Sequence, residues 1–226
     1  IMENVTNIKS PQHIENFNEW ISSLENMGYV SKDFDLQATD FGIPQTRKRT
    51  FMLSFFCGND QELKQRVRER LFNSPLNNPR EMLNIAPIPL KNLLRVDYDN
   101  ETYKHEARLQ VPNNTPSRKK IFENNPVIVD KNFKILAENV RTITTRQDRH
   151  PNSGVLNICK TALNLEDEKS SFRYLTAREA FLLMGFKEED YQKLIDNNFS
   201  LSSKKMMFTM NKLLKVLEDR KVFLES

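Results

Sequence analysis

Residues 40–49 read Asp-Phe-Gly-Ile-Pro-Gln-Thr-Arg-Lys-Arg and run directly into residues 50–56, Thr-Phe-Met-Leu-Ser-Phe-Phe. A compact apolar run of this length predicts a β-strand. Residues 33–38 alternate between polar and apolar side chains, which is typical of a strand with one buried face. The pattern therefore predicts two strands that flank a basic loop over residues 39–49.

The residues before these strands predict a further strand and a helix. Residues 1–5 read as the end of a buried strand, and Ser10 followed by Pro11 signals a helix start. We expect the helix to end at Gly28. Its apolar face consists of Ile14, Phe17, Ile21 and Leu24. Strand, helix, strand, loop and strand form an α/β pattern. Because domains rarely begin on such a strand, we expect the chain to be cut from a larger protein.

Beyond the second strand the pattern becomes loop-rich. Asp60 can cap a helix over residues 61–72. Residues 73–132 are rich in Pro and Asn and contain only short apolar pieces, such as 90–96 and 127–129. This composition predicts loops and short strands. We expect an inserted small domain that runs to about residue 168.

Helices return in the last part of the chain. Thr176 and Glu179 have the spacing of a capping box, and Gly185 marks the end of the helix that they begin. Two further helices are predicted, over residues 188–195 and 202–224.

Composition argues against several classes of protein. The 226 residues are 38% hydrophobic and 28% charged, and no run approaches the ~18 apolar residues that a membrane span needs. The first residues lack the apolar stretch of a secretory leader. Cys57, Cys159 and three histidines are too few for a disulfide framework and argue against a metal site. We expect a cytoplasmic protein with no metal, whose two thiols are buried.

Positive charge is concentrated in four segments, 47–49, 118–120, 141–149 and 204–205, and the formal net charge is +4. Such clusters permit nucleic-acid binding. A single basic triplet is nevertheless more often a solvated face.

The basic loop has a spacing of its own. In an extended chain Gln45, Arg47 and Arg49 would share one face. Three donors in a row can clamp phosphates or a base edge. They equally suit an exposed edge strand, so this spacing leaves both interpretations open.

Four short motifs follow one another along residues 3–186. Residues 3–5 read Glu-Asn-Val, residues 45–49 read Gln-Thr-Arg-Lys-Arg, and residues 173–186 begin Arg-Tyr-Leu-Thr-Ala-Arg-Glu and end Met-Gly-Phe. Between them, residues 141–154 run from Arg-Thr-Ile-Thr-Thr-Arg to Pro-Asn-Ser-Gly. In chain order the motifs resemble those of the DNA (cytosine-5) methyltransferases. Residues 141–154 resemble the close of that family's target-recognition domain, and residues 173–186 resemble its ninth motif. Each motif alone is weak, whereas the ordered set is specific.

The resemblance implies an α/β fold, the C-terminal portion of a Rossmann-like, S-adenosylmethionine-dependent methyltransferase with an inserted, loop-rich target-recognition domain. Residues 1–57 would be the tail of the catalytic domain and residues 58–168 the target-recognition, DNA-binding domain. Residues 169–226 would be the helices that return to the catalytic domain.

Methylation of ring carbon 5 of cytosine requires an activated ring. A thiolate that adds at ring carbon 6 makes an enamine, and an acid at ring nitrogen 3 offsets the developing charge. The resemblance implies that Glu3 is this acid, if burial keeps its carboxyl group protonated near neutral pH. A glutamate at a strand end can also simply cap the next segment.

The resemblance also assigns residues to the target cytosine and to DNA. It implies that Arg49 lies at the flipped cytosine, while Gln45 and Arg47 support the pocket and the approach of the DNA backbone. It also implies that four residues near the end of the target-recognition domain lie near the DNA, namely Arg146, Arg149, Asn152 and Ser153. Residues 141–149 also fit an ordinary solvated strand.

Two parts of the family's machinery are missing from this sequence. The Phe-x-Gly-x-Gly loop for S-adenosylmethionine and the Pro-Cys-Gln nucleophile would both precede Glu3, and neither occurs. The family's last motif, Gln-x-Gly-Asn, would fall at residues 208–211, where only Asn211 matches. Asn211 is therefore the one candidate contact to the cofactor, and we expect an N-terminal half or a separate subunit to bring the rest.

The expected function is that of a C-terminal fragment or subunit of a DNA (cytosine-5-)-methyltransferase. It would methylate a flipped-out cytosine in a specific duplex sequence, in restriction-modification, and would be inactive alone. The alternative is a non-catalytic DNA-binding module derived from the same family. A third possibility is a protein-interaction domain with no role in nucleic-acid binding.

Overall fold

The strands predicted on either side of the basic loop pair directly with each other. In the computed structural model, which describes residues 1–197, β2 (Tyr29–Gln37) and β4 (Lys48–Phe56) are antiparallel. The first strand, β1 (Met2–Val5), pairs antiparallel with the other side of β4. The sheet order is therefore β1-β4-β2, with the strand that follows the basic loop in the centre.

The chain divides into two compact units. Among the described residues, the first contains 1–42 and 46–87, and the second contains 43–45 and 88–197. The functional assignment of residues 58–168 to target recognition stays a prediction. The expected helix over 202–224 and the candidate residue Asn211 lie outside the described residues.

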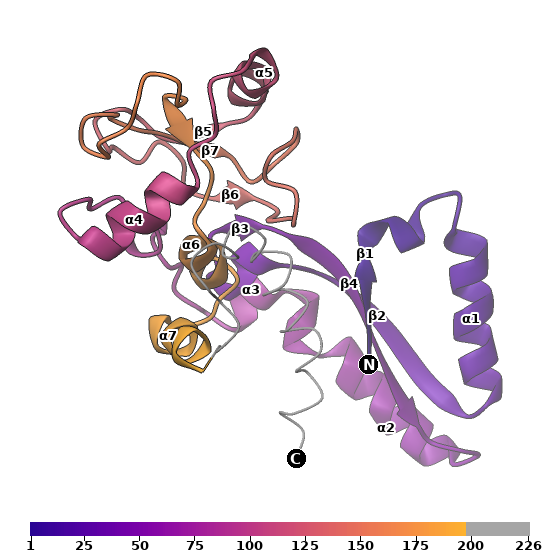
Figure 1. Cartoon of the computed structure of the whole chain (residues 1–226). Coiled ribbons are helices and arrows are strands. Elements are labelled where there is room, and N and C mark those ends of the chain that lie inside the picture. The colour runs from indigo at the N-terminus through magenta and orange to yellow at the C-terminus, as the bar shows by residue number, and fades with distance from the viewer. Residues whose placement is uncertain (198–226) are drawn as a thin grey trace. The chain divides into compact units, whose positions relative to one another are not determined.

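Two helices pack on the sheet of the first unit, α1 (Ile14–Asn26) and α2 (Gln61–Phe72). They lie on opposite sides of it (Figure 1). The side chain of Asp60 accepts a hydrogen bond from the amide of Leu63, which confirms the predicted cap of α2. Leu71 packs with Val30, Phe34 and Cys57 in the core between α2 and the sheet. The thiol of Cys57 is thus buried, as predicted.

Helix α1 begins at Ile14, three residues after the predicted first helical residue, Pro11. Residues Thr6–Lys9 form a 3-10 turn, and the backbone carbonyl of Ser10 accepts hydrogen bonds from the amides of His13 and Ile14. No side chain caps α1, so the assignment of Ser10 as its cap was wrong. The predicted end is confirmed, because Gly28 has a φ of 93° and its amide bonds to Glu25.

Strand β2 is longer than the alternating segment suggested. It begins at Tyr29 because its first four residues continue the ladder with the end of β4, where Tyr29 lies opposite Phe56. The aromatic rings of this pair meet edge to face at 5.2 Å between centroids.

The second unit is built mainly from loops, short strands and short helices. One sheet has the order β5 (Val127–Val129), β7 (Val155–Asn157), β8 (Phe172–Arg173), and β3 (Gln45–Thr46) pairs with β6 (Val140–Arg141) in a separate ladder. The helices of this unit are α4 (Glu101–Leu109), α5 (Pro116–Asn124), α6 (Ala177–Leu182) and α7 (Glu188–Asp196). A short helix, α3 (Pro79–Met82), belongs to the first unit.

The sequence anticipated the loops but not helices α4 and α5. Both begin with capping signals, because Asn100 accepts bonds from the amides of Thr102 and Tyr103, and Thr115 accepts one from Arg118. Helix α6 has the predicted capping box between Thr176 and Glu179. Within residues 1–197, no helix is long and apolar enough to cross a membrane. The same residues form no cluster of His, Cys, Asp and Glu that could hold a metal ion.

We expect Gly154→Ala to destabilise the second unit. Gly154 has a φ of 122°, and an added Cβ would lie 2.6 Å from Cγ1 and 2.7 Å from Cδ1 of Ile128, which is fully buried. Gly185→Ala is the matched control: its φ of 92° is equally strained, but the nearest atom, Cδ1 of Ile43, lies at 3.1 Å.

The overpacking should make Gly154→Ala less stable than Gly185→Ala by about 1–3 kcal/mol in urea unfolding. Equal losses of stability in the two variants would show that the contact with Ile128 carries no cost.

Candidate functional site

Glu3 and Arg49 meet on one face of the first sheet. Val5 lies opposite Arg49, and Glu3 lies opposite Phe51. Because side chains alternate along a strand, Glu3 and Arg49 are diagonal neighbours on the same face. Their side chains form an ion pair, with 3.1 Å between Nε of Arg49 and Oε1 of Glu3. The carboxylate and the guanidinium that resemblance assigned to the cytosine are thus brought together.

This pair is accessible rather than sealed in the core. The side chain of Glu3 is 45% exposed and that of Arg49 is 20% exposed. The burial that we expected around the Glu3 carboxyl group is therefore not present in this structure. Arg49 also donates from Nη1 to the carbonyl oxygen of Lys48 at 2.8 Å. That second bond fixes its guanidinium beside the carboxylate, with one side of the pair open.

Arg47 stands next to the same pair. It falls between β3 and β4 and is partly buried. Burial lowers the pKa of Arg47, the charge of Arg49 lowers it further, and Glu3 acts in the opposite direction. Two arginines and one glutamate therefore share a field in which positive charge is in excess. Such a field favours an anionic or electron-rich ligand.

Gln45 does not join this group. Its side chain is 1% exposed, and Nε2 donates to the carbonyl oxygen of Leu183 at 2.9 Å. Its Oε1 accepts from the amide of Ile143 at 3.1 Å. The single extended strand expected through Gln45, Arg47 and Arg49 is not present, because Gln45 lies in β3, Arg49 lies in β4 and Arg47 lies in neither strand. In this structure the amide of Gln45 holds two loops of the second unit together and is not free to contact DNA.

The opposite face of the sheet carries a charge cluster that sequence reasoning missed. Lys9 bonds Asp33 at 2.7 Å and Asp35 at 2.9 Å, and Thr50 donates to Asp35 at 2.7 Å. Partial burial opposes ionisation of Asp35, but Thr50 and Lys9 outweigh it and lower the pKa of this carboxyl group. The cluster ties the turn after β1 to β2. It therefore helps to fix the strand that carries Glu3.

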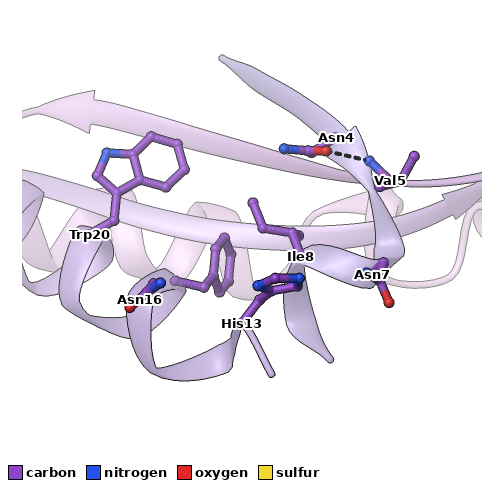
Figure 2. A pocket seen from close by; sticks show the side chains of 8 residues that line it. Asn4, Val5, Asn7, Ile8, His13, Asn16 and Trp20 are labelled. Atoms are coloured by element: carbon purple, nitrogen blue, oxygen red, sulfur yellow. Dashed lines mark hydrogen bonds between the residues drawn. The ribbon is translucent and has the colours of Figure 1, made fainter. Parts of the chain in front are cut away.

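A groove of about 360 Å³ lies beside β1 and the start of α1 (Figure 2). Aromatic rings of Phe17 and Trp20 form one part of its wall, 6.3 Å apart between centroids. Glu3 and Arg49 do not line it. Its lining is Asn4, Val5, Asn7, Ile8, His13, Asn16, Phe17 and Trp20.

The residues assigned to DNA in the second unit separate into two groups. Arg146 and Arg149 are exposed on the loop that follows β6. Asn152 and Ser153 are 2% and 0% exposed. Asn152 donates to the carbonyl oxygen of Gln147 at 2.7 Å, and the hydroxyl of Ser153 donates to Oε1 of Gln147. Both side chains therefore shape the loop from inside, and the prediction that Asn152 and Ser153 lie near DNA stays a prediction.

The ninth motif forms a buried network of charges. Arg173 and Glu179 are fully buried and joined by two bonds of 2.7 Å. Burial lowers the pKa of Arg173, but the Glu179 carboxylate outweighs burial and raises it. Arg178 bonds Glu106 of α4 at 2.8 Å and also pairs with Glu188 of α7. The charged residues of this motif thus hold the helices of the second unit together and have no free group for a ligand.

The thiol of Cys159 is not buried, contrary to the prediction. It lies at an intermediate exposure, 3.0 Å from the hydroxyl of Thr161. Hydrogen bonds from Thr161 and from the backbone at Ala162 lower the pKa of Cys159.

We expect Gln45→Ala to loosen the second unit. The change would leave the amide of Ile143 and the carbonyl of Leu183 without their partner, at about 1–3 kcal/mol for each buried group. The measurement is hydrogen exchange at the Ile143 amide together with urea unfolding. Gln192→Ala, which removes an exposed amide bonded to Asp196 at 2.7 Å, is the control and should change stability by less than about 0.5 kcal/mol. Unchanged protection of the Ile143 amide in Gln45→Ala would contradict the assignment.

Comparison with solved structures shows the fold. The chain matches the crystal structure of the S. pombe Dnmt2 methyltransferase with a TM-score of 0.52 at 18% identity, over 92% of this chain and 59% of that one. It matches a Spodoptera frugiperda DNMT2 mutant with a TM-score of 0.52 at 15% identity, over 96% of this chain and 65% of that one. These likenesses confirm the α/β methyltransferase fold expected from the sequence.

Sequence comparison shows the family. The chain is 27% identical over 203 residues to the Type II methyltransferase M2.ScrFI of Lactococcus lactis subsp. cremoris, which covers 89% of this chain and 48% of the relative. It is 41% identical over 54 residues to the orphan methyltransferase M.SssI of Spiroplasma monobiae, over 24% of this chain and 14% of the relative. The chain thus spans about half the length of M2.ScrFI. A model of the C-5 cytosine-specific DNA methylases matches residues 1–210. The chain therefore belongs to the C-5 cytosine-specific DNA methylase family.

Proposed function

We propose that this chain supplies the base pocket and the target-recognition part of a DNA (cytosine-5) methyltransferase. The whole enzyme would transfer a methyl group from S-adenosylmethionine to ring carbon 5 of a cytosine flipped out of a specific duplex sequence. The observation that carries this proposal is the ion pair of Glu3 and Arg49, 3.1 Å apart on neighbouring strands of the sheet. Family membership supports the reaction class.

The chemistry of cytosine fits this pair. The edge of cytosine that pairs with guanine presents an amino group that donates, and a ring nitrogen and a carbonyl oxygen that accept. A carboxyl group can accept from the amino group and donate to the ring nitrogen when it is protonated, whereas a guanidinium can only donate. Glu3 would therefore face the amino group and ring nitrogen 3, and Arg49 the carbonyl oxygen.

The same pair can assist the reaction. When a thiolate adds to ring carbon 6, electron density moves toward ring nitrogen 3 and the carbonyl oxygen. Donors placed at these two atoms stabilise the developing charge more strongly than they bind the ground state. Arg47, whose charge adds to that of Arg49, would reinforce this field.

Flipping the base costs a few kcal/mol, which contacts to the rest of the duplex must offset. The exposed Arg146 and Arg149 suit phosphate contacts. We propose that they belong to the target-recognition region, assigned to residues 58–168, and that the buried Asn152 and Ser153 hold their loop in shape.

The described residues do not fit the cofactor. Their five glycines stand singly along the chain, each with a positive φ, so residues 1–197 offer no glycine-rich cradle for S-adenosylmethionine. We propose that an N-terminal half or subunit brings the cofactor loop and the Pro-Cys-Gln nucleophile, and that this chain is inactive alone. The name of the Type II relative supports a restriction-modification setting. We expect the enzyme to act in the cytoplasm.

The test is reconstitution with a separately made N-terminal half of the M2.ScrFI type. Arg49→Ala should reduce the rate of methyl transfer about 100-fold or more, as loss of a donor to a developing charge does, and change duplex affinity little. Lys48→Ala is the control, because this neighbour is exposed and 3.9 Å from Asp35 on the opposite face. Equal losses of methylation and of duplex binding in Arg49→Ala would contradict the pocket. If the two halves without substitutions bind the duplex together but do not methylate it, the result would favour a non-catalytic DNA-binding module.

A further inference from the structure

We propose that helix α5 is a second phosphate-binding element for duplex DNA, held in a fixed position against residues 144–154, which we call the arginine loop. This inference rests on the proposed DNA-binding function and assigns a role to individual residues within the range 58–168 that no motif singles out. The elements involved all belong to the second unit.

One end of α5 is fixed to the arginine loop through Arg118. Its Nη1 donates to the backbone carbonyl of Asp148 at 2.9 Å and to the hydroxyl of Tyr174 at 3.3 Å. The carboxylate of Asp148 lies 3.7 Å away. Arg118 therefore joins the first turn of α5, the loop and the residue after β8. Because its guanidinium is used in this way, Arg118 is a positioning residue and not a phosphate contact.

The other end of α5 is fixed through Asn125, the residue that follows the helix. Its Oδ1 accepts from the amide of Asn152 at 2.9 Å and lies 3.2 Å from Nδ1 of His150. Its amide group donates to the carbonyl of Ile121 at 2.8 Å and so stays bonded to the helix. Asn125 is 5% exposed, so these bonds are shielded from water. The helix is thus attached to the loop at both of its ends.

The loop itself is ordered from within. Gln147 is 7% exposed and bonds both Asn152 and Ser153. The amide of Gly154 donates to Oδ1 of Asn152 at 2.9 Å. A loop with this many internal bonds presents its exposed side chains in one arrangement. The loop and α5 therefore form one assembly of fixed shape, and the exposed surface of this assembly includes the arginines of the loop and the lysines of the helix.

That surface carries uncompensated positive charge. Lys119 and Lys120 are exposed on α5, and Arg146 and Arg149 are exposed on the loop. Among the ion pairs within residues 1–197, none includes these four side chains. The acid of the loop, Asp148, is paired with Arg118.

Four unpaired cations on a fixed surface fit a regular array of phosphates better than an acidic peptide. A duplex has one negative charge per about 1.7 Å of its axis, and each lysine that neutralises a phosphate releases counterions. Glu123 lies on the exposed side of α5 near both lysines and weakens this attraction only in part. Contacts of this kind position a protein on DNA and carry no sequence information. The lysines would therefore set the register in which Arg146 and Arg149 meet the duplex.

The test uses the full chain and a fluorescent duplex of mixed sequence, with affinity measured by anisotropy from 50 to 200 mM salt. In Lys119→Gln/Lys120→Gln the slope of log affinity against log salt should fall in magnitude by about 1–2, since each phosphate contact contributes about 0.9. Affinity near 100 mM salt should fall about 10-fold or more. The control is Lys91→Gln/Lys131→Gln, which removes the same charge from two other exposed lysines of the second unit and should leave the slope unchanged.

A second variant tests the positioning without a change of charge. Asn125→Ala removes the acceptor that attaches α5 to Asn152, so it should also lower the salt slope while circular dichroism still shows a folded chain. A purely structural role would lower the melting temperature and leave the slope of the folded protein unchanged.

The outcomes separate this inference from the proposed function. A wild-type chain with no salt-dependent duplex binding would overturn both. The α5 proposal alone is overturned if the wild-type chain binds the duplex but Lys119→Gln/Lys120→Gln keeps the wild-type salt slope. The same holds if its salt slope falls no more than that of Lys91→Gln/Lys131→Gln.

Discussion

The register of β1 on β4 is the constraint on which the rest of the candidate site depends. Because Val5 lies opposite Arg49, Glu3 is carried to the same face as the guanidinium and within ion-pair distance. A shift of one residue would turn Glu3 to the other face, where Lys9 and Asp35 lie. The bonds from Lys9 to Asp33 and Asp35 hold the turn after β1 and so oppose such a shift. Burial of apolar side chains fixes the sheet, and this charge cluster helps to fix its register.

The second unit depends on a different balance. Much of its length is loop, and its sheets are short. Hydrogen bonds and ion pairs between buried polar groups therefore join segments that no sheet connects. Such groups are costly unless each has a partner. Arg173 has Glu179, Arg178 has Glu106, and Gln45 uses both ends of its amide. The result is a frame in which a loop can hold exposed arginines in a defined place. Recognition of a duplex by loops requires this kind of rigidity.

Features that depend on local spacing could be read from the sequence. The capping box of Thr176 and Glu179 is one example, and the cap of α2 by Asp60 is another. That Glu3 and Arg49 lie close together was expected only through family resemblance, since no local rule relates residues so far apart, and the ion pair between them is shown by the structure. The start of α1 was misplaced because Ser10 has the chemistry of a cap but its chain forms a turn instead.

Burial of polar residues could not be predicted, because it depends on partners far along the chain. Gln45, Asn152 and Ser153 look like surface residues in sequence, yet each is enclosed by bonds that only the folded loops create. Helices α4 and α5 were missed inside a Pro- and Asn-rich segment, although Asn100 and the pair Thr115-Pro116 are ordinary helix starts. These caps would have placed the basic cluster at residues 118–120, which the charge pattern had already indicated, on a helix.

The most direct test of the account is a double-mutant cycle between Glu3 and Arg49 in the reconstituted enzyme, with kcat/KM of methyl transfer as the readout. The variants are Glu3→Gln, Arg49→Gln and the two combined. If both side chains hold one cytosine, the combined variant should lose far less activity than the product of the two single losses, because each change already disables the shared pocket. Losses that multiply independently would show that Glu3 and Arg49 do not act on the same base.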